Sequence, residues 1–96
     1  MEKINLKESS QKKSVQYNPV VLSDGTSVQF TKSVDGEKKD LRGRAVKDDK
    51  ELGTASFNPG TNRIFLSVHP VSEMGESLAK EIAETLMSGI LMMFND

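Results

Sequence analysis

The chain has 96 residues, which is short enough that a single hydrophobic core, and therefore one domain, is expected. Its 13 basic and 14 acidic residues leave a net charge of −1, so bulk charge favours neither nucleic acid nor a membrane surface as partner. The sequence contains no cysteine, which excludes disulfide bonds, thiol catalysis and thiolate metal sites.

Residues 1–14 are polar and mixed in charge, without the apolar segment of a signal peptide, and they predict a disordered N-terminal tail. The longest apolar run, residues 90–94, has five residues, whereas a membrane-spanning helix needs about 20. We therefore expect a cytoplasmic protein with no membrane segment and a single domain over residues 15–96.

Residues 15–68 have the pattern of short β-strands separated by turns. The first stretch, residues 15–22, contains Pro19, which cannot donate to a strand ladder, so an edge strand or a broken strand is expected there. Residues 26–34 alternate apolar and polar side chains with the period of a half-buried strand. Similar stretches follow at residues 41–47, 51–57 and 63–68, with turns or loops expected at 23–25, 35–40, 48–50 and 58–62.

From Ser72 the apolar period changes from two residues to about 3.6, which indicates an amphipathic helix. Ser72 is the expected N-cap, and Gly75 weakens the helix start. The predicted apolar stripe consists of Leu78, Ile82, Leu86, Ile90, Met93 and Phe94. The fold class is therefore α+β: an antiparallel β-meander of four or five strands followed by one C-terminal amphipathic helix packed on one face of the sheet.

The sequence offers few residues for catalysis. His69 is the one histidine, so a metal site with several histidines is excluded, and a hydrolytic triad would depend on His69 alone. Asp48 and Asp49 are adjacent in a turn, where carboxylates point apart into solvent. The glycine turns do not precede helices and are therefore not phosphate loops. We expect no enzyme, no catalytic residue, no metal and no cofactor.

The middle strands are rich in cations. Residues 32–50 contain seven basic and five acidic residues, and Arg42 and Arg44 share one strand face. If Arg63 and Phe65 lie on that face, it combines cations with an aromatic ring, the pattern that holds single-stranded nucleic acid. The alternative is an ordinary solvated face whose charges discourage edge pairing. The candidate nucleic-acid residues are Lys38, Lys39, Arg42, Arg44, Lys47, Arg63 and Phe65.

The end of the predicted helix is apolar on every side apart from Ser88 and Gly89, so one sheet cannot cover it all. Pairing with a second copy would cover the remainder. A different protein partner and a core formed wholly within the chain are the alternatives. The candidate interface residues are Leu86, Met87, Ile90, Leu91, Met93 and Phe94.

The sequence thus favours a small, non-enzymatic, homodimeric module for binding or protein interaction. The alternative is single-stranded nucleic-acid binding through a basic sheet face. Residues 73–96 carry a net charge of −4, so such a face has to lie on the opposite side of the sheet from the helix. An enzyme built around His69 is the third hypothesis.

Overall fold

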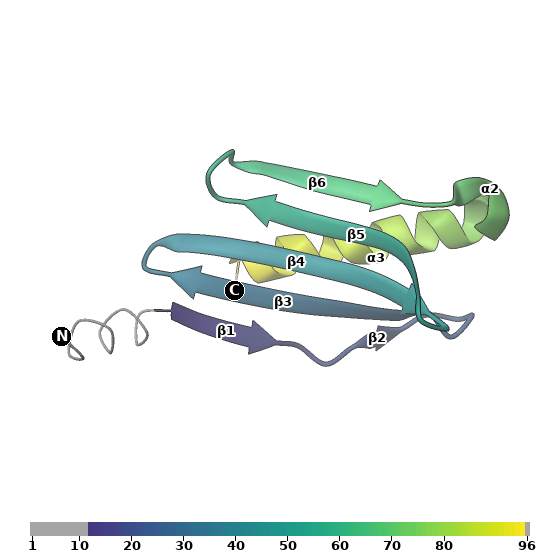
Figure 1. The fold of residues 1–96 in the computed structure, drawn as a ribbon, viewed down its shortest axis with the longest axis horizontal. Coiled ribbons are helices and arrows are strands. Elements are labelled where there is room, and N and C mark those ends of the chain that lie inside the picture. The colour runs from purple at the N-terminus through teal and green to yellow at the C-terminus, as the bar shows by residue number, and fades with distance from the viewer. Residues whose placement is uncertain (1–11, 96) are drawn as a thin grey trace.

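The computed structural model of the protein describes residues 12–95. Its strands form one antiparallel sheet in the order β1-β3-β4-β5-β6, and β2 also pairs with β3. The helix α3 packs across one face of this sheet, behind the strands in Figure 1. The α+β meander with a C-terminal helix is therefore confirmed. The elements are β1 (Lys12–Gln16), β2 (Val20–Val21), β3 (Ser27–Asp35), β4 (Lys38–Lys47), β5 (Lys50–Asn58), β6 (Arg63–Val68), α2 (Val71–Met74) and α3 (Glu76–Asn95).

The first strand region is broken, as the position of Pro19 predicts. β1 and β2 both pair with β3, and residues 17–19 separate them. β1 begins at Lys12, so residues 12–14 of the predicted tail are part of the sheet. The rest of that tail, residues 1–11, lies outside the described residues.

The β3–β4 connection is shorter than predicted. Residues 38–40, which we expected in a loop, are the first residues of β4 and pair with the end of β3. A tight turn is enough here because Gly36 has a positive φ of 65°. The register then places Lys38 opposite Asp35, and a cross-strand pair of opposite charge is favourable.

The predicted single helix is divided at Gly75, whose φ of 87° is outside the helical region. Its carbonyl oxygen accepts a hydrogen bond from the N–H of Ala79, so α3 starts immediately afterwards. Ser72 lies inside α2 and is not the N-cap, because the carbonyl of Pro70 accepts the first hydrogen bond of α2 from Glu73. The period of 3.6 residues detected the helical region but not this break.

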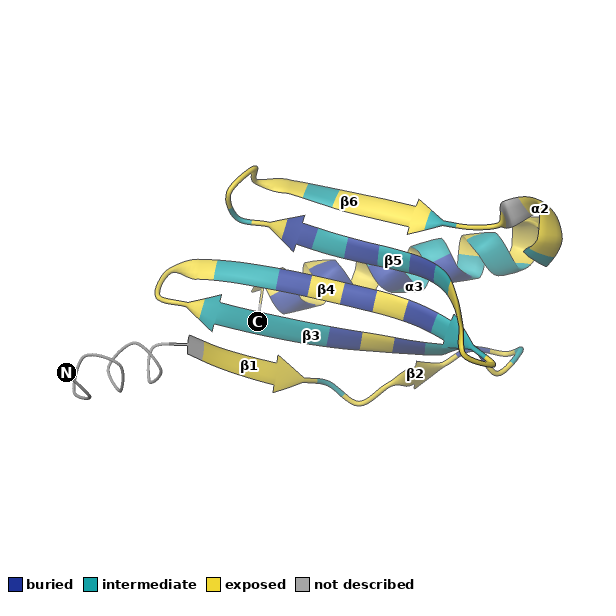
Figure 2. Ribbon diagram, in the orientation of Figure 1, coloured by how far each residue is buried: buried dark blue, intermediate teal, exposed yellow. Residues whose placement is uncertain are grey.

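The core lies between α3 and the central strands, and the buried residues of β3, β4 and β5 alternate with more exposed ones in Figure 2. Burial of each of these aliphatic side chains stabilises the folded protein by about 1.5–3 kcal/mol. Gly43 and Gly53 let the helix approach closely, because a β-carbon on either residue would lie 3.1 Å from a helix side chain, Leu86 and Ile82 respectively. The completely buried helix residues are Ile82, Leu86, Ile90 and Met93.

Candidate functional site

Among residues 12–95, no helix covers the sheet face opposite α3, and we call this face the open face. The strand register places side chains in rows across this face. One row runs Gln16, Thr31, Arg42, Ser56 and Phe65, since each residue is the cross-strand partner of the next. A neighbouring row runs Gln29, Arg44, Thr54 and Ser67. Arg63 is two residues from Phe65 in β6 and shares its face. The open face therefore carries Arg42, Arg44, Arg63 and the aromatic ring of Phe65.

The centre of the open face is hollowed into a groove of about 610 Å³ over β4 and β5. Arg42 and Arg44 lie along the groove, and hydroxyl and amide side chains supply neutral donors and acceptors. Phe65 is 53% exposed and lies one strand away, next to Ser56. The groove is lined on its polar side by Gln29, Thr31, Asp40, Arg42, Arg44, Glu51, Thr54, Ser56 and Asn58.

Arg42 and Arg44 are both already paired with carboxylates. Nε of Arg42 donates to Oδ1 of Asp40 over 3.2 Å, and Nε of Arg44 donates to Oε2 of Glu51 over 2.8 Å. All four side chains are well exposed, and ion pairs of this kind contribute only about 0–1 kcal/mol. A polyanionic ligand can therefore compete for the guanidinium groups, although the two carboxylates weaken the positive potential of the groove.

Two of the predicted nucleic-acid residues lie elsewhere. Nζ of Lys39 donates to the carbonyl oxygen of Phe94 over 3.2 Å and lies 6.0 Å from the centre of that ring, on the helix side of the sheet. Nζ of Lys47 is 3.2 Å from Oδ2 of Asp24. Strand alternation places Lys38 on the open face with Arg42. The structure therefore brings together Lys38, Arg42, Arg44, Arg63 and Phe65, and not Lys39 and Lys47.

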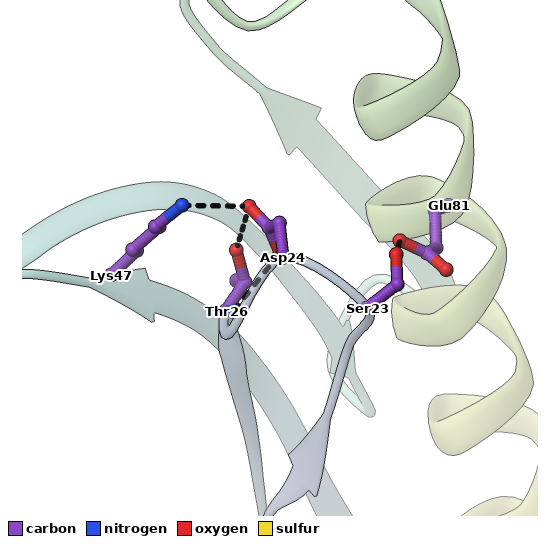
Figure 3. A network of polar contacts seen from close by, with 5 residues as sticks. All are labelled: Ser23, Asp24, Thr26, Lys47 and Glu81. Atoms are coloured by element: carbon purple, nitrogen blue, oxygen red, sulfur yellow. Dashed lines mark hydrogen bonds and ion pairs between the residues drawn. The ribbon is translucent and has the colours of Figure 1, made fainter.

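A polar cluster at the β2–β3 turn was not predicted from the sequence (Figure 3). The Asp24 carboxylate accepts hydrogen bonds from the hydroxyl of Thr26 over 2.9 Å and from its backbone N–H over 3.0 Å. These bonds, helped by Lys47, hold the pKa of Asp24 below its usual range. Ser23 donates to Glu81 of α3 over 3.2 Å, so the cluster ties the turn to the helix.

The predicted interface residues divide into two groups. Leu86, Ile90 and Met93 are fully buried against the protein's own sheet, whereas Met87 is half-buried. Leu91 and Phe94 are each 45% exposed. The half-buried Met87 and the exposed Leu91 and Phe94 are four and three residues apart in sequence, which places them on one side of the helix, and we call these three residues the α3 flank.

Phe94 of the α3 flank lies on the side of the helix that faces β5 and the β5–β6 loop. Phe94 packs edge-to-face on Phe57 of β5, with ring centres 5.1 Å apart, and shares a pocket with Pro59 and Asn62 of the β5–β6 loop. The opposite side of α3, including Met92, lines a separate groove of about 560 Å³ towards β1 and β2. Leu66, on the helix side of β6, is also 40% exposed. Leu66 was not among the predicted interface residues, which all come from the helix.

The described residues include no group of three or more histidine, cysteine or acidic side chains arranged to hold a metal ion. His69 is exposed at the end of β6, where its backbone N–H donates to the carbonyl of Leu52 over 3.0 Å. Within residues 12–95, neither helix combines the length and apolar character needed to cross a membrane.

Comparison of the chain with protein-family models, with curated proteins and with solved structures finds no match. The functional reading therefore depends on the geometry of the chain itself.

Proposed function

We propose that the protein is a small, non-enzymatic binding module that acts as a homodimer. The supporting observation is the apolar surface that the fold leaves uncovered along α3 and β6. Leu66 is 40% exposed, and Leu91 and Phe94 are each 45% exposed. Large apolar side chains left exposed on a domain this small support an interaction site. Closed twofold dimers are the commonest way to cover such a surface.

Light scattering coupled to size-exclusion chromatography tests the homodimer. We expect the mass of a dimer for the wild-type protein at about 100 µM, with dissociation on dilution. Leu91→Lys places a charge in the α3 flank and should yield a monomer. Met92→Lys is the matched control, because Met92 is 62% exposed on the other side of α3, and it should remain dimeric. A monomeric wild-type protein at the highest concentration would overturn the homodimer.

A second candidate function is the binding of single-stranded nucleic acid on the open face. It is supported by the register that aligns Arg42, Ser56 and Phe65 in one row beside Arg44. Phosphates attract arginine, and an exposed ring provides a stacking surface for bases of any sequence. Hydroxyl and amide groups in the groove would contact sugars and base edges.

Fluorescence anisotropy with labelled single-stranded DNA and RNA tests this second candidate. Binding should weaken as salt rises, because counterions are released from the phosphates. The double variant Arg42→Ala/Arg44→Ala should lose binding. The control Lys39→Ala/Lys80→Ala removes the same charge away from the open face and should keep most of it. Absence of binding at low salt, or an equal loss in both double variants, would reject nucleic acid as the ligand.

A further inference from the structure

The two edges of the sheet differ in how well they are protected against pairing with another strand. The edge formed by β1 and β2 is interrupted at residues 17–19, contains Pro19 and includes Lys13. Lysine, proline and short strands are the features that block edge pairing. β6, at the upper edge in Figure 1, has six residues with a charge only at Arg63, its first position. β6 is therefore the edge open to a further strand.

The backbone groups that β6 presents to its free edge follow from the hydrogen-bond pattern. The N–H of His69 donates to the carbonyl of Leu52, which makes these two residues a hydrogen-bonded pair. Hydrogen-bonded and non-hydrogen-bonded pairs alternate along an antiparallel ladder, so Ser67 and Phe65 turn their backbone groups towards β5. The N–H and C=O groups of Ile64, Leu66 and Val68 therefore point outwards.

We propose that β6 pairs antiparallel with β6 of a second copy, centred on Leu66. This register places Leu66 opposite the partner's Leu66 and Ile64 opposite the partner's Val68. All three outward-facing residues then form hydrogen-bonded pairs. Centring on Phe65 would pair only Ile64 and Leu66, so the register on Leu66 satisfies more of the free backbone groups.

The side chains of β6 suit a second copy of the same strand. On the helix side, the pairing is aliphatic against aliphatic, and it covers the exposed Leu66. Arg63 lies opposite the partner's His69 at the end of the strand, so the two arginines do not face each other. A twofold axis perpendicular to the sheet also places both α3 helices on the same face of the joined sheet.

This pairing rests on the proposed homodimer and specifies how it forms. It also joins the two open faces into one surface, because the twofold axis keeps them on the same side of the joined sheet. Phe65 of each copy then lies near the centre of that surface, with the arginine rows outside it. A single strand of nucleic acid that spans both copies would contact both rings.

Amide hydrogen exchange resolved by residue tests the pairing. At dimer concentrations, the amides of Ile64, Leu66 and Val68 should be protected at least tenfold more than after dilution to monomer, while those of Phe65 and Ser67 stay protected in both. A dimer mass with fast exchange at those three amides would overturn strand pairing and leave the homodimer intact. A monomer mass at the highest concentration overturns both proposals.

A proline variant separates strand pairing from association through the helices. Val68→Pro removes an outward N–H and leaves the ladder with β5 intact, so a folded monomer is expected. Leu66→Lys places a charge on the same edge strand, which disfavours strand pairing, so this variant should also be monomeric. It provides a second test if the proline variant fails to fold. Met92→Lys is again the dimeric control. Dimers of both folded β6 variants would reject the proposal, and capture of an unrelated strand by a monomeric wild-type chain would do so as well.

Discussion

The ring of Phe30 lies against the backbone of Gly89, in the space that a β-carbon on that helix residue would occupy. The ring is also close to Gly43, its cross-strand partner, where a β-carbon would lie 2.8 Å from Cε1 of Phe30. Phe30 therefore packs against two glycines, one on the sheet and one on α3. This packing fixes how closely the helix approaches β3 and β4.

Replacing Gly89 with alanine should destabilise the protein, although alanine is the better helix former by about 1 kcal/mol. The added methyl group has to displace a buried aromatic ring, and such overpacking costs about 1–3 kcal/mol or more. We expect a net loss of about 1–2 kcal/mol in the free energy of unfolding, measured by urea denaturation.

The smaller side chain of Phe30→Leu provides the control for that measurement. In this background the methyl group of Gly89→Ala has more room, so its cost should fall or reverse. An equal cost with phenylalanine and with leucine at position 30 would show that the ring is not what Gly89 accommodates.

Acid should destabilise the β2–β3 turn through Asp24. Hydrogen bonds from Thr26 lower the pKa of this carboxyl in the folded protein. The stabilisation of the folded protein by the ionised Asp24 carboxylate is complete above the pKa of an aspartate in the unfolded chain, about 3.9. This stabilisation is lost as the pH falls through the lower pKa of Asp24 in the folded protein. Asp24→Asn should therefore lose less stability than the wild-type protein between about pH 5 and pH 2, as measured by thermal unfolding across that range. Parallel pH profiles for the two proteins would contradict this role of Asp24.

Thr26→Val should cost about 1–2 kcal/mol, because it removes the hydroxyl from a completely buried residue whose partner is a carboxylate. The shape of the side chain is almost unchanged, so the loss reports the hydrogen bond rather than packing. A double-mutant cycle with Asp24→Asn measures the coupling. Ser77→Ala, at an exposed position in the first turn of α3, is the neutral reference. A coupling near zero would assign the effect of Thr26 to something other than Asp24.

Local signals were enough to predict the meander. Alternation and turn residues set each strand separately, and Pro19 marked the interruption in the first one. The errors occur where one residue overrides the surrounding pattern: Gly36 shortens a charged loop to a tight turn, and Gly75 divides the helical region. Both glycines were visible in the sequence, but their positive φ depends on how the neighbouring elements meet.

The residues of the open face could not all be predicted from the sequence. Alternation shows which side chains of one strand share a face, but only the register between strands shows which faces of different strands coincide. The register of β5 with β6 is what joins Phe65 to Ser56 and, through it, to Arg42. The α3 flank was harder to predict. The predicted apolar stripe correctly included the buried Met93 and left out the exposed Leu91, but it also included Phe94, which is 45% exposed.

The carboxylates on the open face lead to a final prediction about charge. Oε2 of Glu51 accepts a hydrogen bond from Nε of Arg44 over 2.8 Å, and the Glu51 carboxylate neutralises part of the positive charge of the groove. If the groove binds single-stranded nucleic acid, Glu51→Gln should raise the affinity at low salt by roughly two- to fivefold, since a released surface ion pair is worth about 0.5–1 kcal/mol. Added salt should diminish this gain.

Glu84→Gln makes the same charge change on the exposed side of α3 and serves as the control. It should change the affinity less than Glu51→Gln, because Glu84 is on the helix side of the sheet and screening limits its effect on the groove. Equal gains in both variants would indicate that only net charge matters, and the ligand would then not be held by Arg44. If neither variant changes the affinity, the nucleic acid does not bind on the open face.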